Sequence, residues 1–209
     1  MPEREDVSPL TLNRLSIYLR ALRQVQESGL RRISSQELAR RYHLSAAQIR
    51  KDLAQFGEFG IRGVGYEVDT LCDRLIELLG LNRAHSIVIV GMGNLGSALA
   101  RYLGFNSGPF RVVAGVDTDP EKIGHRIGEI TVRAAAELPE VVRASRAEIG
   151  ILTVPPGVAQ ANYEALADAG VRGVLNFTPD RIKGRPDVSV KNVDLRIHLE
   201  ELAFFLREG

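Results

Sequence analysis

The sequence has little of what secreted, membrane or zinc-bound proteins depend on. Its one cysteine, Cys72, cannot close an internal disulfide or supply a cysteine zinc cluster. It has no tryptophan, and apolar runs such as Ile87 to Val90 are far shorter than the ~20 residues of a membrane-spanning helix. The first six residues are acidic and mixed, unlike a secretion signal, which is basic and then apolar. We therefore expect a cytoplasmic protein with no membrane segment and no structural metal.

The composition is otherwise that of a globular protein. The chain has 209 residues, of which 44% are hydrophobic and 25% are charged, so it can form one large domain or two smaller ones. Its charge is uneven: residues 7–66 hold ten Lys or Arg against four Asp or Glu, a net of +6, and the remainder holds 17 against 22, a net of −5. A compact basic segment favours a polyanionic partner such as nucleic acid.

A first helix is predicted from Ser8 onward. Ser8 is a good N-cap, Pro9 suits the first helical position, and Gly29 supplies a C-terminal stop. Between them, apolar residues recur at steps of three and four, which predicts one buried face. These residues are Leu12, Leu15, Leu19, Leu22 and Val25.

Two short helices with helix-turn-helix spacing follow. Ser34 with Glu37, and Ser45 with Gln48, each have the sequence pattern of a capping box, which marks the start of a helix. The two helices are joined by a tight turn around Leu44. This is the spacing of a helix-turn-helix motif.

The second of these helices has small and basic residues on its predicted outer face. Ile49, Leu53 and Phe56 line its inner side at helical spacing. Small side chains allow close approach to the major groove, and Lys or Arg can donate to guanine or to phosphate. A solvated helix face with ordinary charges is the alternative interpretation. The predicted DNA contacts are Ala47, Gln48, Arg50 and Lys51, with Lys51 as the first choice for a base contact.

The next stretch has the pattern of a glycine-turned β-hairpin. Its glycines are Gly57, Gly60, Gly63 and Gly65, and its alternating apolar residues are Phe59, Ile61, Val64, Tyr66 and Val68. A hairpin after a helix-turn-helix is a wing. Arg62 and Gly63 lie at its predicted tip, where a guanidinium without bulky neighbours can enter the minor groove. A bare tight turn is the alternative, but the order of these elements favours a winged-helix DNA-binding domain.

A second domain begins with a glycine-rich loop in the context that dinucleotide binding requires. A β-branched strand, Ser86 to Val90, leads into the loop, and a helix follows it. In this GxGxxG pattern the first glycine permits a tight turn, the second lets a pyrophosphate approach the backbone, and the third lets helix and strand pack closely. The helix N-terminus attracts the phosphates. The predicted contacts are Gly91, Met92, Gly93, Asn94, Leu95 and Gly96.

An acidic residue follows the second strand at the expected distance. Val112 to Val116 ends in Asp117, which is 117 minus 96, or 21, residues beyond Gly96. A carboxylate there can accept hydrogen bonds from the adenosine ribose and would repel a 2′-phosphate, which favours NAD(H) over NADP(H), although Asp119 is close enough to compete for that role.

Further residues are expected at the carboxyl ends of later strands, where doubly wound sheets bind ligands. Ile149 to Val154 and Val174 with Leu175 are predicted strands. The residues predicted to wall the nicotinamide half are Thr153, Val154, Pro155, Asn176 and Phe177. Core packing explains Phe177 equally well.

No catalytic constellation is apparent. The histidines, His43, His85, His125 and His198, are scattered, and none follows a strand that ends at the predicted site. The ~130 residues after the winged helix leave no room for a separate substrate domain. We therefore expect a bound cofactor to be sensed rather than consumed. An NAD-dependent oxidoreductase whose N-terminal domain serves assembly is the alternative.

The C-terminal segment is predicted to be a helix that is apolar on more than one side, with Leu195, Leu199, Leu202, Leu206, Ile197, Phe204 and Phe205. Such a helix should be covered by a second body, and a two-fold dimer would also suit a palindromic operator. The predicted fold is α/β, with three parts. A winged-helix domain spans residues 1–80, a Rossmann-like doubly wound parallel sheet spans 81–193, and a dimerisation helix spans 194–209.

Over nearly its whole length the chain resembles the Rex family of redox-sensing transcriptional repressors. The segments that carry the resemblance are Gln48 to Leu53, Phe56 with Gly57, Arg62 to Tyr66, Val90 to Gly96, Asn176 with Phe177, and Asn192 to Asp194. The resemblance implies a homodimer that exchanges its C-terminal helix between subunits. It also implies a repressor that NADH releases from its operator, with NAD+ competing for the same site.

The resemblance further implies a switch. Asp194 would pair with Arg20 in the DNA-competent form and turn towards Tyr102 when NADH closes the dimer. One departure is Leu195, where many Rex proteins carry a phenylalanine that packs on nicotinamide. A repressor that senses another nucleotide, such as coenzyme A, remains an alternative.

Overall fold

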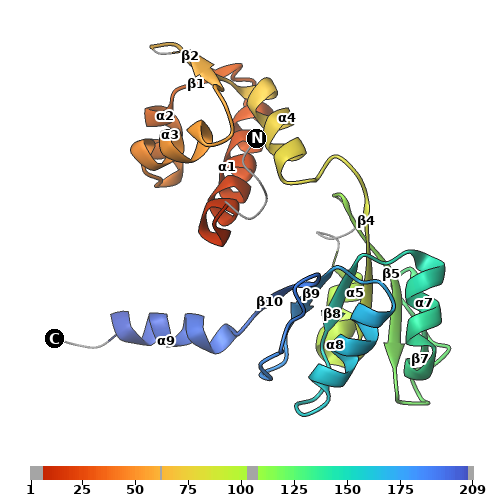
Figure 1. Cartoon of the computed structure of the whole chain (residues 1–209). Helices are drawn as coiled ribbons and strands as arrows, with labels where there is room; N and C mark the ends of the chain where they lie inside the picture. Colours follow the sequence, from red (N-terminus) through yellow and green to blue (C-terminus); the bar gives the residue numbers. More distant parts are fainter. Residues whose placement is uncertain (1–6, 62, 103–107, 207–209) are drawn as a thin grey trace. The chain divides into compact units, whose positions relative to one another are not determined.

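The computed structural model describes residues 7–61, 63–102 and 108–206 (Figure 1). It divides into two compact units, Met1–Arg83 and Ala84–Gly209, each with its own hydrophobic core. The second unit includes the C-terminal segment that the sequence analysis set apart as residues 194–209. Of the predicted DNA contacts, Arg62 lies outside the described residues.

The helices of the first unit begin where the sequence predicts. The side-chain oxygens of Ser8, Ser34 and Ser45 each accept a hydrogen bond from a backbone N–H in the first turn, so each serine is an N-cap. His43 has a left-handed backbone with φ 53°, which ends the second helix. The helices are α1 (Pro9–Glu27), α2 (Ser35–Tyr42), α3 (Ala46–Ala54) and α4 (Val68–Leu78).

Two details of these helices differ from the prediction. The capping boxes are only half formed, because Glu37 pairs with Arg40 and Arg41 instead of returning to its cap, and Gln48 bonds to a buried acid described below. Leu12, expected on the buried face of α1, is 41% exposed. The other four apolar residues of that face are buried.

A small antiparallel sheet completes the first unit. Its strands are β1 (Arg32–Ile33), β2 (Gly60–Ile61) and β3 (Gly65–Glu67), in the order β1-β3-β2. The β2–β3 pair is the predicted hairpin, whereas β1 was not predicted. Gly65 has φ +94°, and a Cβ there would lie 2.6 Å from the carbonyl oxygen of Ile33, so glycine is required. Val68, expected in the hairpin, instead begins α4 and is buried, because its side chain packs into the helical core.

The second unit contains the predicted doubly wound sheet. Its strands are β4 (His85–Val90), β5 (Phe110–Asp117), β6 (Arg126–Ile127), β7 (Ile130–Ala134), β8 (Ile149–Leu152), β9 (Gly173–Asn176) and β10 (Ser189–Asn192). The order is β10-β9-β8-β4-β5-β7-β6, and the only antiparallel pair among these described strands is β6 with β7. Without β6 this is the strand order of the dinucleotide-binding fold, with its switch point between β4 and β8. The β6–β7 hairpin was not predicted.

Helices cover both faces of this sheet (Figure 1). Successive strand side chains point to opposite faces. Val88 and Val90 of β4 share a core with α7 (Leu138–Ser145) and α8 (Ala159–Asp168), whereas Ile87 and Ile89 share another with α5 (Asn94–Arg101). A short 3-10 turn, Ala135–Glu137, precedes α7. This arrangement leaves the carboxyl ends of the parallel strands at one edge of the sheet, where the predicted ligand residues lie.

The last helix, α9 (Leu195–Phe205), has no buried residue. Its apolar side chains are widely exposed, from 53% for Ile197 to 80% for Phe205. The prediction of a helix that is apolar on several sides is confirmed. Among the described residues, no helix has the length and apolar character needed to cross a membrane.

Candidate functional sites

Helix α3 presents the outer face that the sequence predicts. Ile49 and Leu53 are buried in the core of the first unit. Ala47, Arg50 and Lys51 are consequently exposed, whereas Gln48 is half-buried. The exposed face therefore combines one small side chain with two cations, a composition suited to contact with DNA.

A buried ion pair that the sequence analysis missed ties α3 to α1. Asp52 is fully buried, and its carboxylate accepts hydrogen bonds from Arg14 Nε at 2.5 Å and Nη2 at 2.8 Å, Tyr18 Oη at 2.9 Å and Gln48 Nε2 at 2.7 Å. Burial alone would raise the pKa of Asp52, but the bonds from Arg14, Gln48 and Tyr18 outweigh it and hold that pKa below its ordinary value. Arg14 lies 38 residues away in the chain, so no local pattern reveals the pair.

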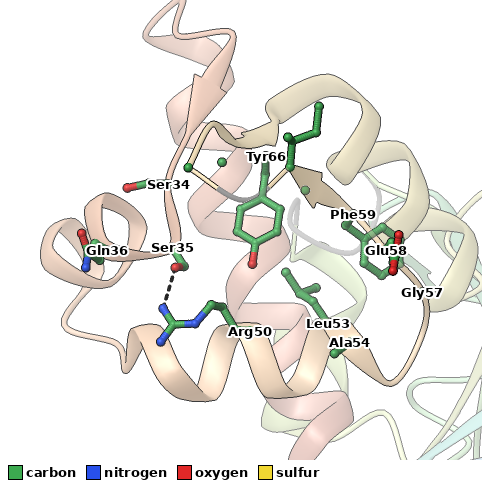
Figure 2. Close-up of a pocket in the computed structure, with 14 residues that line it drawn as sticks. Ser34, Ser35, Gln36, Arg50, Leu53, Ala54, Gly57, Glu58, Phe59 and Tyr66 are labelled. Atoms are coloured by element: carbon green, nitrogen blue, oxygen red, sulfur yellow. Dashed lines mark hydrogen bonds between the residues drawn. The ribbon is translucent and has the colours of Figure 1, made fainter.

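The first unit also has an open groove of about 920 Å³ (Figure 2). It lies among the start of α2, helix α3 and the β2–β3 hairpin, and it is lined in part by Ser35, Arg50, Phe59 and Tyr66. Arg50 Nη1 donates a hydrogen bond to Ser35 Oγ at 2.9 Å. Arg50 was predicted as a DNA contact, but Ser35, Phe59 and Tyr66 were not.

In the second unit, the glycine-rich loop has the shape of a phosphate cradle. Gly91 has φ +93°, and a Cβ there would lie 2.7 Å from the carbonyl oxygen of Thr153. A Cβ on Gly96 would lie 2.0 Å from the carbonyl oxygen of Gly91, so both positions require glycine. A Cβ on Gly93 would meet nothing within 4 Å, and α5 begins at Asn94 without a side-chain cap. Open space and uncapped N–H groups are what a pyrophosphate needs at this loop.

Asp117 lies beside this loop at the end of β5. It is 8% exposed, and its oxygens accept hydrogen bonds from the backbone N–H groups of Met92 at 2.6 Å and Asp119 at 2.9 Å. Burial alone would raise its pKa, but these N–H groups and the nearby Lys122 outweigh burial and hold the pKa of Asp117 below its ordinary value. Oδ2 also accepts from Lys122 Nζ at 3.4 Å, whereas Oδ1 keeps a lone pair that a ribose hydroxyl can use. The Met92 side chain is buried, so Met92 offers this site its backbone only.

A pocket of about 530 Å³ adjoins Gly93 and Asn94. Basic side chains that the sequence analysis missed line its rim: Arg101, Lys122, His125 and Arg126. Lys122 Nζ lies 3.2 Å from Asp119 and 3.4 Å from Asp117. Three of the four follow Asp117 within nine residues, a clustering that could have drawn attention to them.

The other predicted ligand residues lie at the ends of β8 and β9, which are parallel neighbours. Thr153 Oγ1 donates to the carbonyl oxygen of Gly91 at 2.7 Å, so it holds the loop. Asn176 is fully buried, and its amide donates to Asp180 O at 3.0 Å and Asn192 Oδ1 at 2.9 Å. Both side chains therefore shape the walls of the site through contacts within the chain. Val154 and Phe177 are half-buried, and Pro155 is exposed.

The residues of the implied switch lie in different units. Arg20 is exposed on α1, and Tyr102 is exposed at the end of α5. Asp194 is the N-cap of α9: its Oδ1 accepts from the Arg196 N–H at 2.9 Å, and the Arg196 side chain holds the pKa of Asp194 below its ordinary value. Among the described residues, no group of three or more His, Cys, Asp or Glu could hold a metal ion.

Comparison with known proteins finds a match for a segment of each unit. A family described as "Putative DNA-binding protein N-terminus" matches residues 6–54, and one described as "CoA binding domain" matches residues 82–180. The redox-sensing transcriptional repressor Rex of Carboxydothermus hydrogenoformans is 46% identical, over 94% of this chain and 95% of that protein. The Rex repressor of Desulfitobacterium hafniense is 44% identical, over 93% of this chain and 92% of that protein.

Solved structures of a Rex-family repressor are also similar to this chain. The chain is similar to the Rex-family repressor RSP in complex with β-NAD+ and operator DNA, with a TM-score of 0.92 and 34% identity over 96% of this chain and 92% of that one. It is also similar to RSP in complex with β-NADH, with a TM-score of 0.87 and 33% identity over 96% of this chain and 94% of that one.

Proposed function

The chain belongs to the Rex family of redox-sensing transcriptional repressors, and we propose that it represses transcription by binding palindromic operator DNA when NADH is low and leaves the operator when NADH binds. The observation that carries this proposal is the presence of both sites in one chain. Helix α3 exposes Ala47, Arg50 and Lys51, and the second unit has a loop that is open at Gly93. RSP, which is similar over 96% of this chain, has been solved with NADH and with NAD+ and operator DNA.

The sensed ligand is NAD(H). Its pyrophosphate would lie against Gly93 and the N-terminus of α5, and its adenosine ribose beside Asp117. Asp117 is ionised and would repel a 2′-phosphate. Coenzyme A is the competing ligand, favoured by the description of the matching family and by the basic rim at Arg101 and Arg126. Lys122, which lines the same pocket, has its charge balanced by Asp117 and Asp119.

The protein senses this ligand without turning it over. The relatives of the chain are transcriptional repressors. Thr153 and Asn176 lie at the proposed nicotinamide end, and their polar atoms form hydrogen bonds within the chain. These side chains therefore shape the site and do not transfer protons. Its relatives are transcriptional repressors of bacteria, whose DNA lies in the cytoplasm, so the protein acts there.

The functional unit is a homodimer joined through α9. The large exposed area of Leu195, Leu199 and Phe205 favours this arrangement, because monomeric proteins rarely expose contiguous apolar surface of this kind. Two copies related by a two-fold axis present two α3 helices to a palindrome.

Asp194 is the switch residue in this proposal. It pairs with Arg20 in the DNA-competent form and turns to Tyr102 when NADH is bound. Its position supports this role, since Asp194 joins β10 to α9 and follows Asn192, which bonds to the buried Asn176. NAD+ and NADH differ by one charge on the nicotinamide ring, so a nearby carboxylate responds differently to the two.

A single titration tests the proposal. A palindromic duplex is selected from random DNA with the purified protein, and NADH, NAD+ or coenzyme A is then added at fixed salt, because salt alone changes the affinity for DNA. Release by NADH and not by NAD+ is expected. Release by coenzyme A alone would reassign the ligand, and failure to select any duplex would move the oxidoreductase alternative forward.

A further inference from the structure

The groove of the first unit has two chemically different ends. Ser35, Gln36 and Arg50 lie at one end, and Glu58 lies at the other (Figure 2). An anion is therefore attracted to the Arg50 end and repelled from the Glu58 end. The groove passes between α3 and the β2–β3 hairpin.

Tyr66 directs a hydroxyl into this groove (Figure 2). Its side chain is held in place: only 8% of the residue is exposed, and a Cβ on Gly60 would lie 2.8 Å from the ring. The hydroxyl makes no hydrogen bond with any residue that the structure describes. Burial raises the pKa of Tyr66, with Arg50 acting in the opposite direction, so the phenol is protonated and able to donate at neutral pH. Since no buried side-chain polar atom of the described residues lacks a partner, this hydroxyl is open to the groove, where a ligand can accept its hydrogen bond.

Two further donors reach the same end of the groove. Arg50 Nη1 is 2.9 Å from Ser35 Oγ, which orients the guanidinium along the wall and away from the outermost face of α3. Ser34 caps only the N–H of Glu37, so the first N–H groups of the eight-residue helix α2 have no side-chain cap. Arg50, Tyr66 and the start of α2 thus present hydrogen-bond donors to the same end of the groove.

We propose that this groove holds the sugar–phosphate backbone of one DNA strand, with a phosphate bound by Arg50, the Tyr66 hydroxyl and the start of α2. The inference rests on the proposed function and deepens it. If α3 lies in the major groove and the hairpin in the neighbouring minor groove, the strand that separates the two grooves must run between α3 and the hairpin. Arg50 is then a phosphate contact, and base readout belongs to Ala47 and Lys51.

The matched pair Tyr66→Phe and Tyr18→Phe provides the first test. Both remove only a hydroxyl, but that of Tyr18 bonds to Asp52 inside the core, whereas that of Tyr66 has no partner in the described chain. Tyr18→Phe should lower the midpoint of thermal unfolding, and Tyr66→Phe should leave it unchanged or raise it. Tyr66→Phe should also weaken binding about tenfold, equally for operator and unrelated duplexes. Equal affinity of Tyr66→Phe and wild type for both duplexes would overturn the proposal.

Arg50 and Lys51 provide the second test, because they are adjacent cations with different assigned roles. Arg50→Gln should weaken binding to all duplexes and reduce the slope of log affinity against log salt by about one. Lys51→Gln should instead relax the base preference at one position of the half-site. If Arg50→Gln instead lost the preference for a particular base at one position of the half-site, Arg50 would contact that base. That result would overturn the assignment of Arg50 to a phosphate.

Chemical replacement of single phosphates locates the contact. Each operator phosphate is replaced in turn by an uncharged methylphosphonate, and affinity is measured for wild type and Arg50→Gln. Replacement at one position is expected to weaken DNA binding by wild type and to have little additional effect on DNA binding by Arg50→Gln. A wild-type chain that binds no duplex would overturn the proposed function and the groove assignment together. Tight operator binding with no such position would overturn only the groove assignment.

Discussion

The two units each bury a carboxylate next to their functional surface, and they stabilise it in different ways. Asp52 in the first unit is surrounded by side chains from two helices, with Arg14 as its counter-ion. Asp117 in the second unit is held mainly by the backbone N–H groups of Met92 and Asp119, close to its own strand. The DNA-binding surface therefore depends on particular side chains, whereas the dinucleotide loop depends on backbone groups and on glycines. Substitutions should affect the two units differently.

The largest expected effect is the loss of the counter-ion of Asp52. Arg14→Ala leaves a fully buried carboxylate with a weakened set of partners and should destabilise the first unit by about 3 kcal/mol. Arg74→Ala is the control, because Arg74 forms an exposed pair with Glu77 and its removal should cost at most about 0.5 kcal/mol. Urea unfolding, with NADH binding as a separate measure of the second unit, checks both. Equal destabilisation by the two variants would contradict the assigned importance of the buried pair.

Two glycines of the loop separate stability from binding. Gly96→Ala places a Cβ against the Gly91 carbonyl and should lower the free energy of unfolding of the second unit by about 1–3 kcal/mol. Gly93→Ala meets no atom in the protein, so it should leave that free energy unchanged while it weakens NADH binding by about tenfold or more, because its methyl group occupies the ligand's approach. Thermal unfolding and NADH titration measure the two effects. A Gly93→Ala variant that binds NADH normally would show that the pyrophosphate lies elsewhere.

Asp194 is only half-buried, unlike Asp52 and Asp117, so its removal should alter coupling more than stability. Asp194→Ala should uncouple NADH from DNA release, a loss of about 1–2 kcal/mol of coupling free energy. Asp194→Asn keeps an N-cap for α9 and removes the charge, which separates capping from switching. Operator affinity with and without NADH gives the coupling for each variant. Unchanged NADH sensitivity in both would reject Asp194 as the switch.

The smallest predicted effect is the response to acid. Asp52 and Asp117 have lowered pKa values in the folded protein, so each stabilises it above the unfolded value of about 4, and that contribution is lost as the pH falls through the folded pKa. Stability should therefore decline below about pH 4. Asp52→Asn should flatten this decline in the first unit and leave that of the second unit as it is, which denaturant titrations across pH 2 to 6 can show. An unchanged acid profile would mean that Asp52 does not contribute to it.

The comparison also explains which features the sequence could predict. Ser8, Ser34 and Ser45 act on N–H groups a few residues away, so each helix start is visible locally. The loop from Gly91 to Gly96 is visible through the spacing of its glycines, although the atoms that require Gly91 belong to Thr153, 62 residues away. These features led to the two-domain fold and to the dinucleotide loop.

Features that depend on distant partners could not be predicted in this way. Asp52 looks like one more polar residue on α3 until Arg14 and Tyr18, 38 and 34 residues away, are placed against it. The groove behind Tyr66 likewise exists only once β1 and α2 pack beside the hairpin. Tertiary packing, which no short pattern encodes, determines these sites.

Helix α9 has a consequence for how this protein behaves on dilution. Its 11 residues are fewer than the ~12–15 that an isolated helix needs to be stable in water, and none of them is buried within its own chain. In the proposed dimer its helicity is therefore linked to association by mass action. The helical content of the protein then reports its oligomeric state, falling as the concentration drops below the dissociation constant and recovering when the subunits meet again.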